Sequence, residues 1–180
     1  HLELCRDIAQ KFNNDYKIEN FFIVPEPLIK KEFSRIMSLK DGLKKMSKSE
    51  VSDLSRINLT DDKDQIINKI KKAKTDTLPL PSKIEDLENR PEAKNLIGIY
   101  SSLMNNTLQK TIDEFAGKNF SEFKEKLSEI VVNEINPISF KIKELLDDKV
   151  FLEKILKDGY EKANEIASKK IKKIQEIVGF

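Results

Sequence analysis

The sequence is poor in the residues that carry metal and redox chemistry. Its 180 residues include one cysteine, Cys5, and one histidine, His1. An internal disulfide is therefore excluded, and a structural zinc site lacks its usual ligands. Long apolar runs are also missing: stretches such as Phe21–Val24 are among the longest, whereas a membrane span needs about 20 apolar residues. With no signal-peptide pattern at its start, the sequence predicts a cytoplasmic protein that does not cross a membrane.

An excess of charge of one sign is missing as well. Lysine and arginine number 33 and aspartate and glutamate 31, which leaves a net charge of +2. This balance does not by itself indicate nucleic-acid binding. Apolar residues make up 38% and charged residues 36%, a composition typical of a highly charged globular chain. The length allows one or two domains with a buried core.

The chain opens inside a helical pattern. His1 is not a methionine, and apolar residues already recur at helical spacing at positions 2, 5, 8, 9 and 12. We therefore expect the sequence to be the later part of a longer protein.

The first part of the sequence alternates between helical and extended patterns. Apolar runs at 21–24, 35–39 and, more weakly, 57–59 are predicted to be strands. A helix up to about Tyr16 precedes them, and another follows Asp62. This alternation is typical of an α/β sheet covered by helices.

From Leu78 onward a proline-containing polar connector leads into a pattern that is helical throughout. Pro91 is expected to start a helix and Gly117 to end the next. Ser121 is expected to cap a third helix, which Pro137 should kink or end. The sequence thus predicts an α/β portion followed by an all-α helical bundle, with helices predominating.

The pentapeptide Lys45-Met46-Ser47-Lys48-Ser49 follows the second predicted strand. Its two lysines can place mobile ammonium groups on one polyanion, and its serines add hydrogen-bond donors. In a loop, this group can close over a bound nucleotide. Side chains would then supply the charge, which suits a triphosphate whose pyrophosphate leaves. The alternative is an ordinary lysine-rich loop in a lysine-rich chain, and the motif alone does not decide between the two.

The pentapeptide is similar to the second signature of class I aminoacyl-tRNA synthetases, and the sequence around it resembles the tryptophanyl-tRNA synthetase family. Similar segments occur along the whole chain, at 1–9, 34–39, 58–62, 73–76, 95–101, 123–127 and 159–164. The sister tyrosyl family usually has a different form of the lysine loop, so the resemblance favours tryptophan.

This resemblance implies an enzyme that joins tryptophan to ATP, releases pyrophosphate and transfers the amino acid to tRNA(Trp). Residues 45–49 would bind ATP, with Lys48 stabilising charge on the departing pyrophosphate and Lys45 assisting. Ile36 matches a family position whose backbone contacts the adenine. Mg²⁺ would arrive with ATP, and no protein-bound structural metal is implied.

The resemblance also implies an organisation. Residues 1–78 would be the C-terminal portion of a Rossmann-type catalytic domain, and residues 79–180 a helical anticodon-binding region. The family forms homodimers when full length. Its first signature, which holds the other side of ATP, and the residues that recognise the indole are absent from this sequence. Because catalysis requires ATP held from both sides, we expect these 180 residues to be inactive or nearly so by themselves.

Other residues and functions leave alternatives open. Lys162, Lys169 and Lys173 share a helical face that could contact tRNA phosphates, although nearby glutamates favour a merely solvated face. Cys5 lies on the apolar face of the first helix, where a buried thiol is expected rather than a reactive one. The chain could instead be a stand-alone helical RNA-binding or dimerisation module that retains the lysine loop. It could also belong to a synthetase for another amino acid, such as tyrosine.

Overall fold

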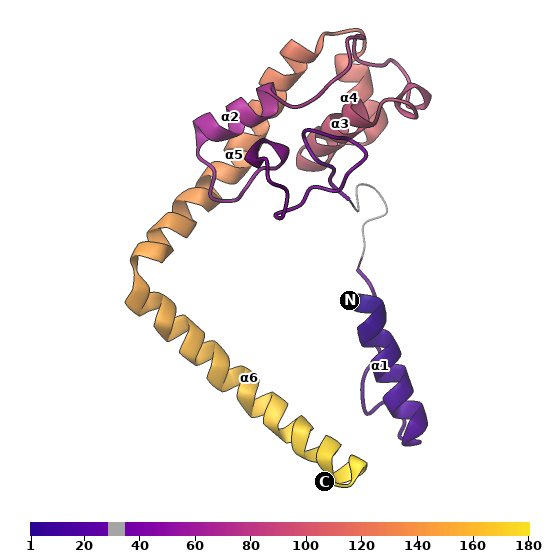
Figure 1. Cartoon of the computed structure of the whole chain (residues 1–180), viewed down its shortest axis with the longest axis vertical. Helices are drawn as coiled ribbons and strands as arrows, with labels where there is room; N and C mark the ends of the chain where they lie inside the picture. The colour runs from indigo at the N-terminus through magenta and orange to yellow at the C-terminus, as the bar shows by residue number, and fades with distance from the viewer. Residues whose placement is uncertain (29–34) are drawn as a thin grey trace. The chain divides into compact units, whose positions relative to one another are not determined.

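The computed structural model describes residues 1–28 and 35–180, and this part of the chain is predominantly helical (Figure 1). Two compact units are present: His1–Lys30 with Lys149–Phe180, and Lys31–Asp148. None of the described helices is long and apolar enough to cross a membrane. The helices are α1 (Leu2–Asp15), α2 (Lys63–Lys71), α3 (Pro91–Leu103), α4 (Leu108–Phe115), α5 (Phe120–Asp147) and α6 (Lys149–Val178), with 3₁₀ turns at Asp53–Ser55 and Glu85–Leu87.

Local sequence signals explain where the helices begin. The Asp62 carboxylate accepts a hydrogen bond from the amide of Gln65 at 2.9 Å, and the Gln65 side chain accepts one from the amide of Asp62, also at 2.9 Å. This reciprocal pair satisfies two amides at the start of α2. Pro91 occupies the first turn of α3, as predicted. Asn119, and not the predicted Ser121, caps α5 by accepting a hydrogen bond from the amide of Glu122. The helix therefore begins two residues earlier than expected.

The later helices confirm one prediction and exclude one of the two outcomes expected at Pro137, where a kink or an end was predicted. Gly117 follows α4 with a φ of +74°, the left-handed conformation that favours glycine at the end of a helix. Pro137, in contrast, does not end α5, which continues from Phe120 to Asp147. A proline removes one backbone hydrogen bond, and here complete turns on both sides of Pro137 maintain the helix.

The three predicted strands are not strands in the described structure, so the predicted α/β sheet is not present there. The described residues contain one isolated antiparallel bridge, between Met37 and Lys45. Asparagine side chains take the place of neighbouring strands. The Asn13 amide pairs with both the N–H and the C=O of Phe22, at 3.0 and 2.8 Å. Asn95 pairs in the same way with Met37, at 2.9 and 2.8 Å. The backbone N–H and C=O groups of these segments are therefore paired without a sheet.

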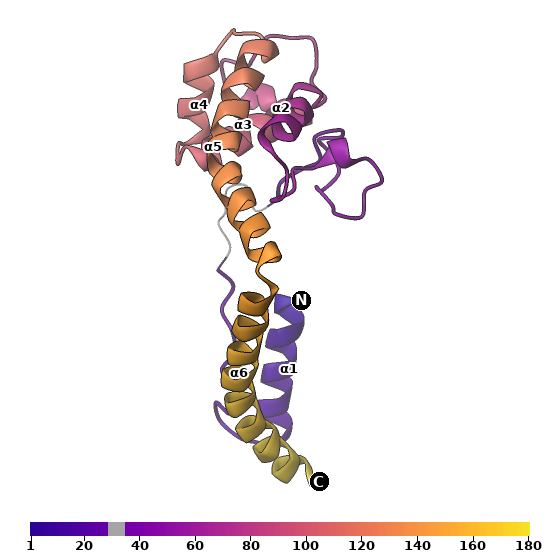
Figure 2. The same ribbon diagram turned by 90° about the vertical axis from the view of Figure 1, so that its left-hand side faces the viewer.

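Helices α2 to α5 of the second unit pack around a common apolar core (Figure 2). Tyr100, Phe115 and Phe123 form an aromatic group with ring centroids 4.9–5.7 Å apart. Burial, together with a hydrogen bond to Glu114, raises the pKa of Tyr100 to about 12. Leu39, which is 2% exposed, joins this core from the segment that precedes the lysine loop. The segment at the base of the loop is therefore fixed on the helices.

Unit one contains α1, α6 and an aromatic cluster beside α1. The rings of Phe12, Tyr16, Phe21 and Phe22 lie within 4.7–5.3 Å of a neighbour. The ammonium group of Lys170 on α6 lies 3.7 Å from the Phe21 ring centroid, a cation–π contact.

Two further features of unit one concern α1. The predicted burial of Cys5 is wrong: its thiol is exposed, because only Ala9 is buried on this helix.

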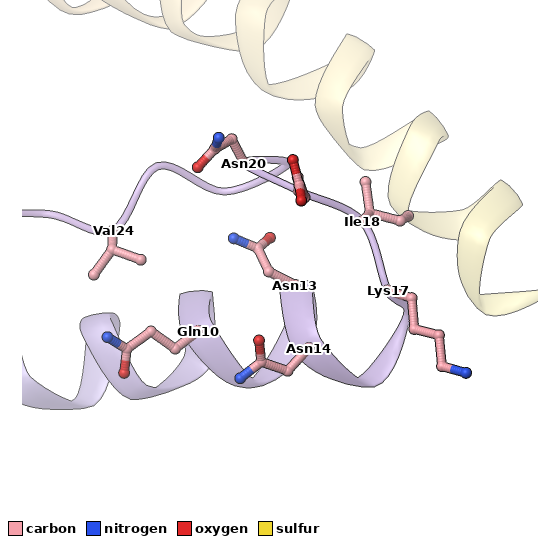
Figure 3. A pocket seen from close by; sticks show the side chains of 8 residues that line it. Gln10, Asn13, Asn14, Lys17, Ile18, Asn20 and Val24 are labelled. Atoms are coloured by element: carbon pink, nitrogen blue, oxygen red, sulfur yellow. The ribbon is translucent and has the colours of Figure 1, made fainter.

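An open hollow of about 560 Å³ lies between α1 and the loop that follows it, lined largely by amide side chains (Figure 3). It contains none of the predicted site residues.

A bidentate ion pair in the connector before α3 predicts a specific pH dependence. The Arg90 guanidinium donates to both carboxylate oxygens of Asp76, at 2.8 and 2.7 Å. These hydrogen bonds lower the pKa of Asp76 in the folded chain. The stabilisation is therefore fully present above the ordinary pKa of aspartate, about 4, and is lost as the pH falls through the lower folded value.

We expect the free energy of unfolding of the wild type to fall more steeply below about pH 4 than that of Arg90→Gln, which lacks the paired guanidinium. Urea unfolding at pH 7 and at several values below 4 measures the difference. If the free energy of unfolding fell equally with pH in the two proteins, the ion pair between Arg90 and Asp76 would not contribute to the pH dependence of stability.

Candidate functional site

The predicted ATP-binding residues lie on a short backbone hairpin, residues 36–46, and on the three residues that follow it, in the second unit. The amide of Ser38 donates to the carbonyl of Lys44 at 2.8 Å, and the amide of Met46 donates to the carbonyl of Ile36 at 3.0 Å. Ile36, the predicted adenine contact, is thus joined directly to the start of the lysine loop, residues 45–49. The hairpin therefore brings together the predicted adenine contact, Ile36, and the first residue of the lysine loop, Lys45, which lie nine residues apart in the sequence.

The side chains of the lysine loop are directed to solvent, with one exception. Lys45, Ser47, Lys48 and Ser49 are exposed, whereas Met46 is partly buried against the core. The Ser47 hydroxyl accepts a hydrogen bond from the amide of Ser49 at 3.2 Å. Neither loop lysine is in an ion pair within the described structure. Both ammonium groups are therefore available to a polyanion.

The hairpin is attached to α3 at two places, one near its beginning and one at its turn. One is the Asn95 amide, 6% exposed, which binds the backbone of Met37 beside Ile36. The other is Gly42, which lies against the start of α3. A Cβ atom on this residue would come within 2.6 Å of the backbone of Pro91 and Glu92. The hairpin and α3 are consequently in direct backbone contact.

We expect Gly42→Ala to lower the free energy of unfolding by about 1–3 kcal/mol, the usual cost of overpacking. The added methyl group meets backbone rather than a flexible side chain, so the hairpin must move away from α3. Gly159→Ala in α6 is the matched control, since nothing lies within 4 Å of its Cβ position, and an alanine inside a helix adds about 0.5–1 kcal/mol of stability. Urea unfolding measures the stability of both variants and of the wild type. Equal stability of Gly42→Ala and wild type would contradict the close packing of the hairpin against α3.

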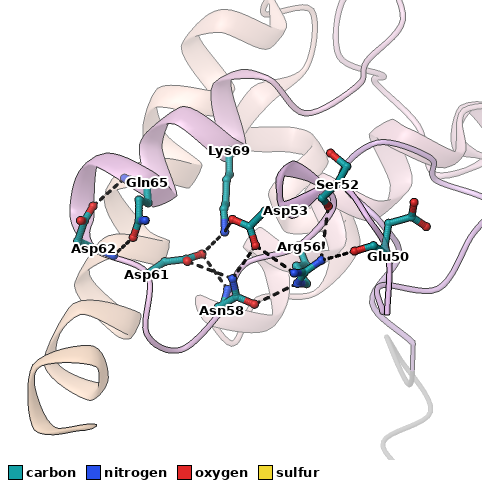
Figure 4. Close-up of polar contacts among 9 residues, drawn as sticks. All are labelled: Glu50, Ser52, Asp53, Arg56, Asn58, Asp61, Asp62, Gln65 and Lys69. Carbon is teal, nitrogen blue, oxygen red and sulfur yellow. Dashed lines mark hydrogen bonds and ion pairs between the residues drawn. The ribbon is translucent and has the colours of Figure 1, made fainter. Parts of the chain in front are cut away.

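The end of the lysine loop leads into a polar cluster, defined by Asp53, Arg56, Asn58, Asp61 and Lys69 (Figure 4). The buried Lys69 ammonium group lies 2.6 Å from Asp61 and 2.7 Å from Asp53. Asn58 donates to Asp53 at 3.0 Å and to Asp61 at 3.2 Å. Hydrogen bonds from Lys69 and Asn58 lower the pKa of Asp53. The cluster keeps the turn after the loop packed on α2.

The residues that hold the hairpin were not predicted from the sequence as site residues. Lys69 occupies an apolar stripe together with Ile66 and Ile70, and a lysine in such a stripe was the available signal of a buried ion pair. Asn95 similarly lies among buried apolar residues of α3.

The predicted tRNA-contacting lysines, Lys162, Lys169 and Lys173, are all exposed on α6. Lys169 forms an ion pair with Glu165 at 2.8 Å. These lysines belong to the first compact unit, whereas the lysine loop belongs to the second.

Comparisons with known proteins define the family. Residues 1–135 match the family described as class I tRNA synthetases (W and Y), and the chain belongs to this family. Within it, the similarity is to the tryptophan enzymes, as the resemblance predicted. The tryptophan–tRNA ligase of Brucella melitensis is 46% identical over 198 residues, which cover 100% of this chain and 56% of that protein.

Solved structures of tryptophanyl-tRNA synthetases are also similar. The Mycoplasma pneumoniae structure matches 100% of this chain and 53% of its own, with a TM-score of 0.82 and 27% identity. The Campylobacter jejuni structure in complex with ADP and tryptophan matches 100% of this chain and 54% of its own, with a TM-score of 0.65 and 29% identity. The chain thus spans about half the length of these relatives.

Proposed function

We propose that the chain is part of a tryptophan–tRNA ligase and contributes the lysine loop that binds ATP. The observation that carries this proposal is the exposed pair Lys45 and Lys48 in a loop that begins on a fixed hairpin, in a chain whose relatives are tryptophan–tRNA ligases. The relative from Campylobacter jejuni holds ADP and tryptophan, the ligand types that this loop would meet.

In the proposed reaction, a carboxylate oxygen of tryptophan forms a bond to the α-phosphorus of ATP. The bond from that phosphorus to the bridging oxygen breaks, and pyrophosphate leaves with the electron pair. The ammonium groups of Lys48 and Lys45 donate to phosphate oxygens as negative charge grows on the leaving group. Ser47 and Ser49 add donors, and the backbone of Ile36 lies beside the adenine. Mg²⁺ is bound mainly through the phosphates of ATP.

The functional division that we propose places residues 1–78 in the Rossmann-type catalytic domain and residues 79–180 in the helical anticodon-binding region. These two parts share one core, since α2 packs along α5. Lys162, Lys169 and Lys173 on α6 would contact tRNA phosphates. The complete enzyme would be a cytoplasmic homodimer. The 180 residues alone would be inactive or nearly so, because catalysis requires ATP held from both sides.

Charging of tRNA tests this function. The complete gene product is incubated with ATP, Mg²⁺, total tRNA and either radiolabelled tryptophan or radiolabelled tyrosine. We expect label in tRNA with tryptophan alone. Label with tyrosine alone would assign a different amino acid, and salt-sensitive tRNA binding without charging would indicate an RNA-binding module.

A further inference from the structure

Arg56 connects the end of the lysine loop to the polar cluster behind it. Its Nη1 donates to the carbonyl of Glu50 at 2.8 Å and lies 3.5 Å from the carbonyl of Ser52. Its Nη2 lies 3.1 Å from the Asp53 carboxylate, and its Nε donates to Asn58 at 3.2 Å. One planar side chain therefore contacts the loop end, the 3₁₀ turn and the segment before α2 (Figure 4).

The groups that hold Arg56 are themselves fixed. Asp53 and Asn58 are bound to each other at 3.0 Å, and Lys69 forms an ion pair with Asp53 at 2.7 Å. The Lys69 side chain is 3% exposed and that of Arg56 18%. Several hydrogen bonds thus determine the orientation of the guanidinium before any ligand binds.

Lys48 lies between two fixed points of the backbone. Before it, the amide of Met46 is bound to the carbonyl of Ile36. After it, the carbonyl of Glu50 is bound to Arg56. The segment free to move over a ligand is therefore short, and less conformational entropy is lost when it closes.

We propose that Arg56 is a positioning residue for Lys48: it fixes the end of the lysine loop so that the ammonium group reaches the phosphates of ATP in one geometry. This inference rests on the proposed function. Arg56 acts through the planar fork of its guanidinium, which binds a carbonyl, a carboxylate and an amide oxygen together. A lysine supplies the same charge from a single flexible point.

The test compares Arg56→Lys with wild type in the complete gene product. We expect the kcat of tryptophan-dependent pyrophosphate–ATP exchange to fall about 10-fold, within the range that small misplacements of catalytic groups produce, with the KM for tryptophan unchanged. Arg90→Lys is the matched control because Arg90 forms its bidentate pair with Asp76, in the connector. We expect it to retain wild-type kcat.

A second measurement does not depend on activity. Trypsin cleaves after Lys48 only when the lysine loop changes conformation to fit the protease. Because Arg56→Lys should free the end of this loop, we expect this variant to be cut after Lys48 several times faster than wild type or Arg90→Lys. Wild-type kcat and an unchanged cleavage rate in Arg56→Lys would overturn the proposal, as would equal losses of kcat in the two arginine variants. Absence of exchange in the wild type would refute the proposed function instead, and the cleavage rates would still decide whether Arg56 fixes the loop.

Discussion

Replacing Lys48 by alanine is expected to slow tryptophan-dependent pyrophosphate–ATP exchange by about 10²–10³-fold in the complete gene product. Removal of one preorganised donor from a developing oxyanion has an effect of this size. Lys48 is exposed and forms no ion pair in the described structure, so its loss should leave the fold intact. The effect should appear mainly in kcat, because charge on pyrophosphate grows in the transition state.

Lys44→Ala is the matched control for this prediction. It removes the same charge one residue before the loop, from a lysine that lies 3.6 Å from Asp41. We expect exchange by this variant to stay within a few-fold of wild type. Equal losses in Lys44→Ala and Lys48→Ala would mean that the general positive charge of the segment matters, and not the placed ammonium group.

The second large effect concerns stability. Replacing Lys69 by methionine should lower the free energy of unfolding by about 3–5 kcal/mol, the typical cost of leaving one partner of a buried ion pair without the other. Asp61 is 4% exposed and cannot regain its hydration while the turn before α2 stays packed. Urea unfolding monitored by circular dichroism measures the loss.

Two variants separate this effect from the loss of a positive charge. Lys126→Met breaks an exposed pair with Glu129 and should leave stability essentially unchanged. Combining Lys69→Met with Asp61→Leu removes both buried charges and should recover much of the lost stability. If Lys69→Met proved as stable as Lys126→Met, the cluster would not support the turn after the lysine loop.

Helical periodicity predicted the helices well, although the cap of α5 is Asn119 and not the predicted Ser121. The stripe of Ile66, Ile70 and Ala73 and the position of Pro91 identified α2 and α3, because these features depend on residues a few positions apart. The apolar run Phe21–Val24 was predicted as a strand, but the structure has no strand there. A strand is defined by its partner, and here the partner is the side chain of Asn13, which no local pattern reveals.

The same distinction applies to the site. The pentapeptide at 45–49 was evident because its residues are contiguous. Its supports come from distant positions: Asn95 reaches Met37 across 58 residues of sequence, and Lys69 reaches Asp53 from the next helix. Such contacts depend on how the helices pack, and a buried polar residue on an apolar face was the available indication of them.

The most direct test of the account is pyrophosphate–ATP exchange with each of the amino acids in turn. It is measured on the complete gene product and on the 180-residue chain. We expect exchange by the complete gene product with tryptophan alone, and little or none by the 180 residues. Exchange supported by another amino acid, or by none while tRNA binding persists, would contradict the assignment of the lysine loop to a tryptophan–tRNA ligase.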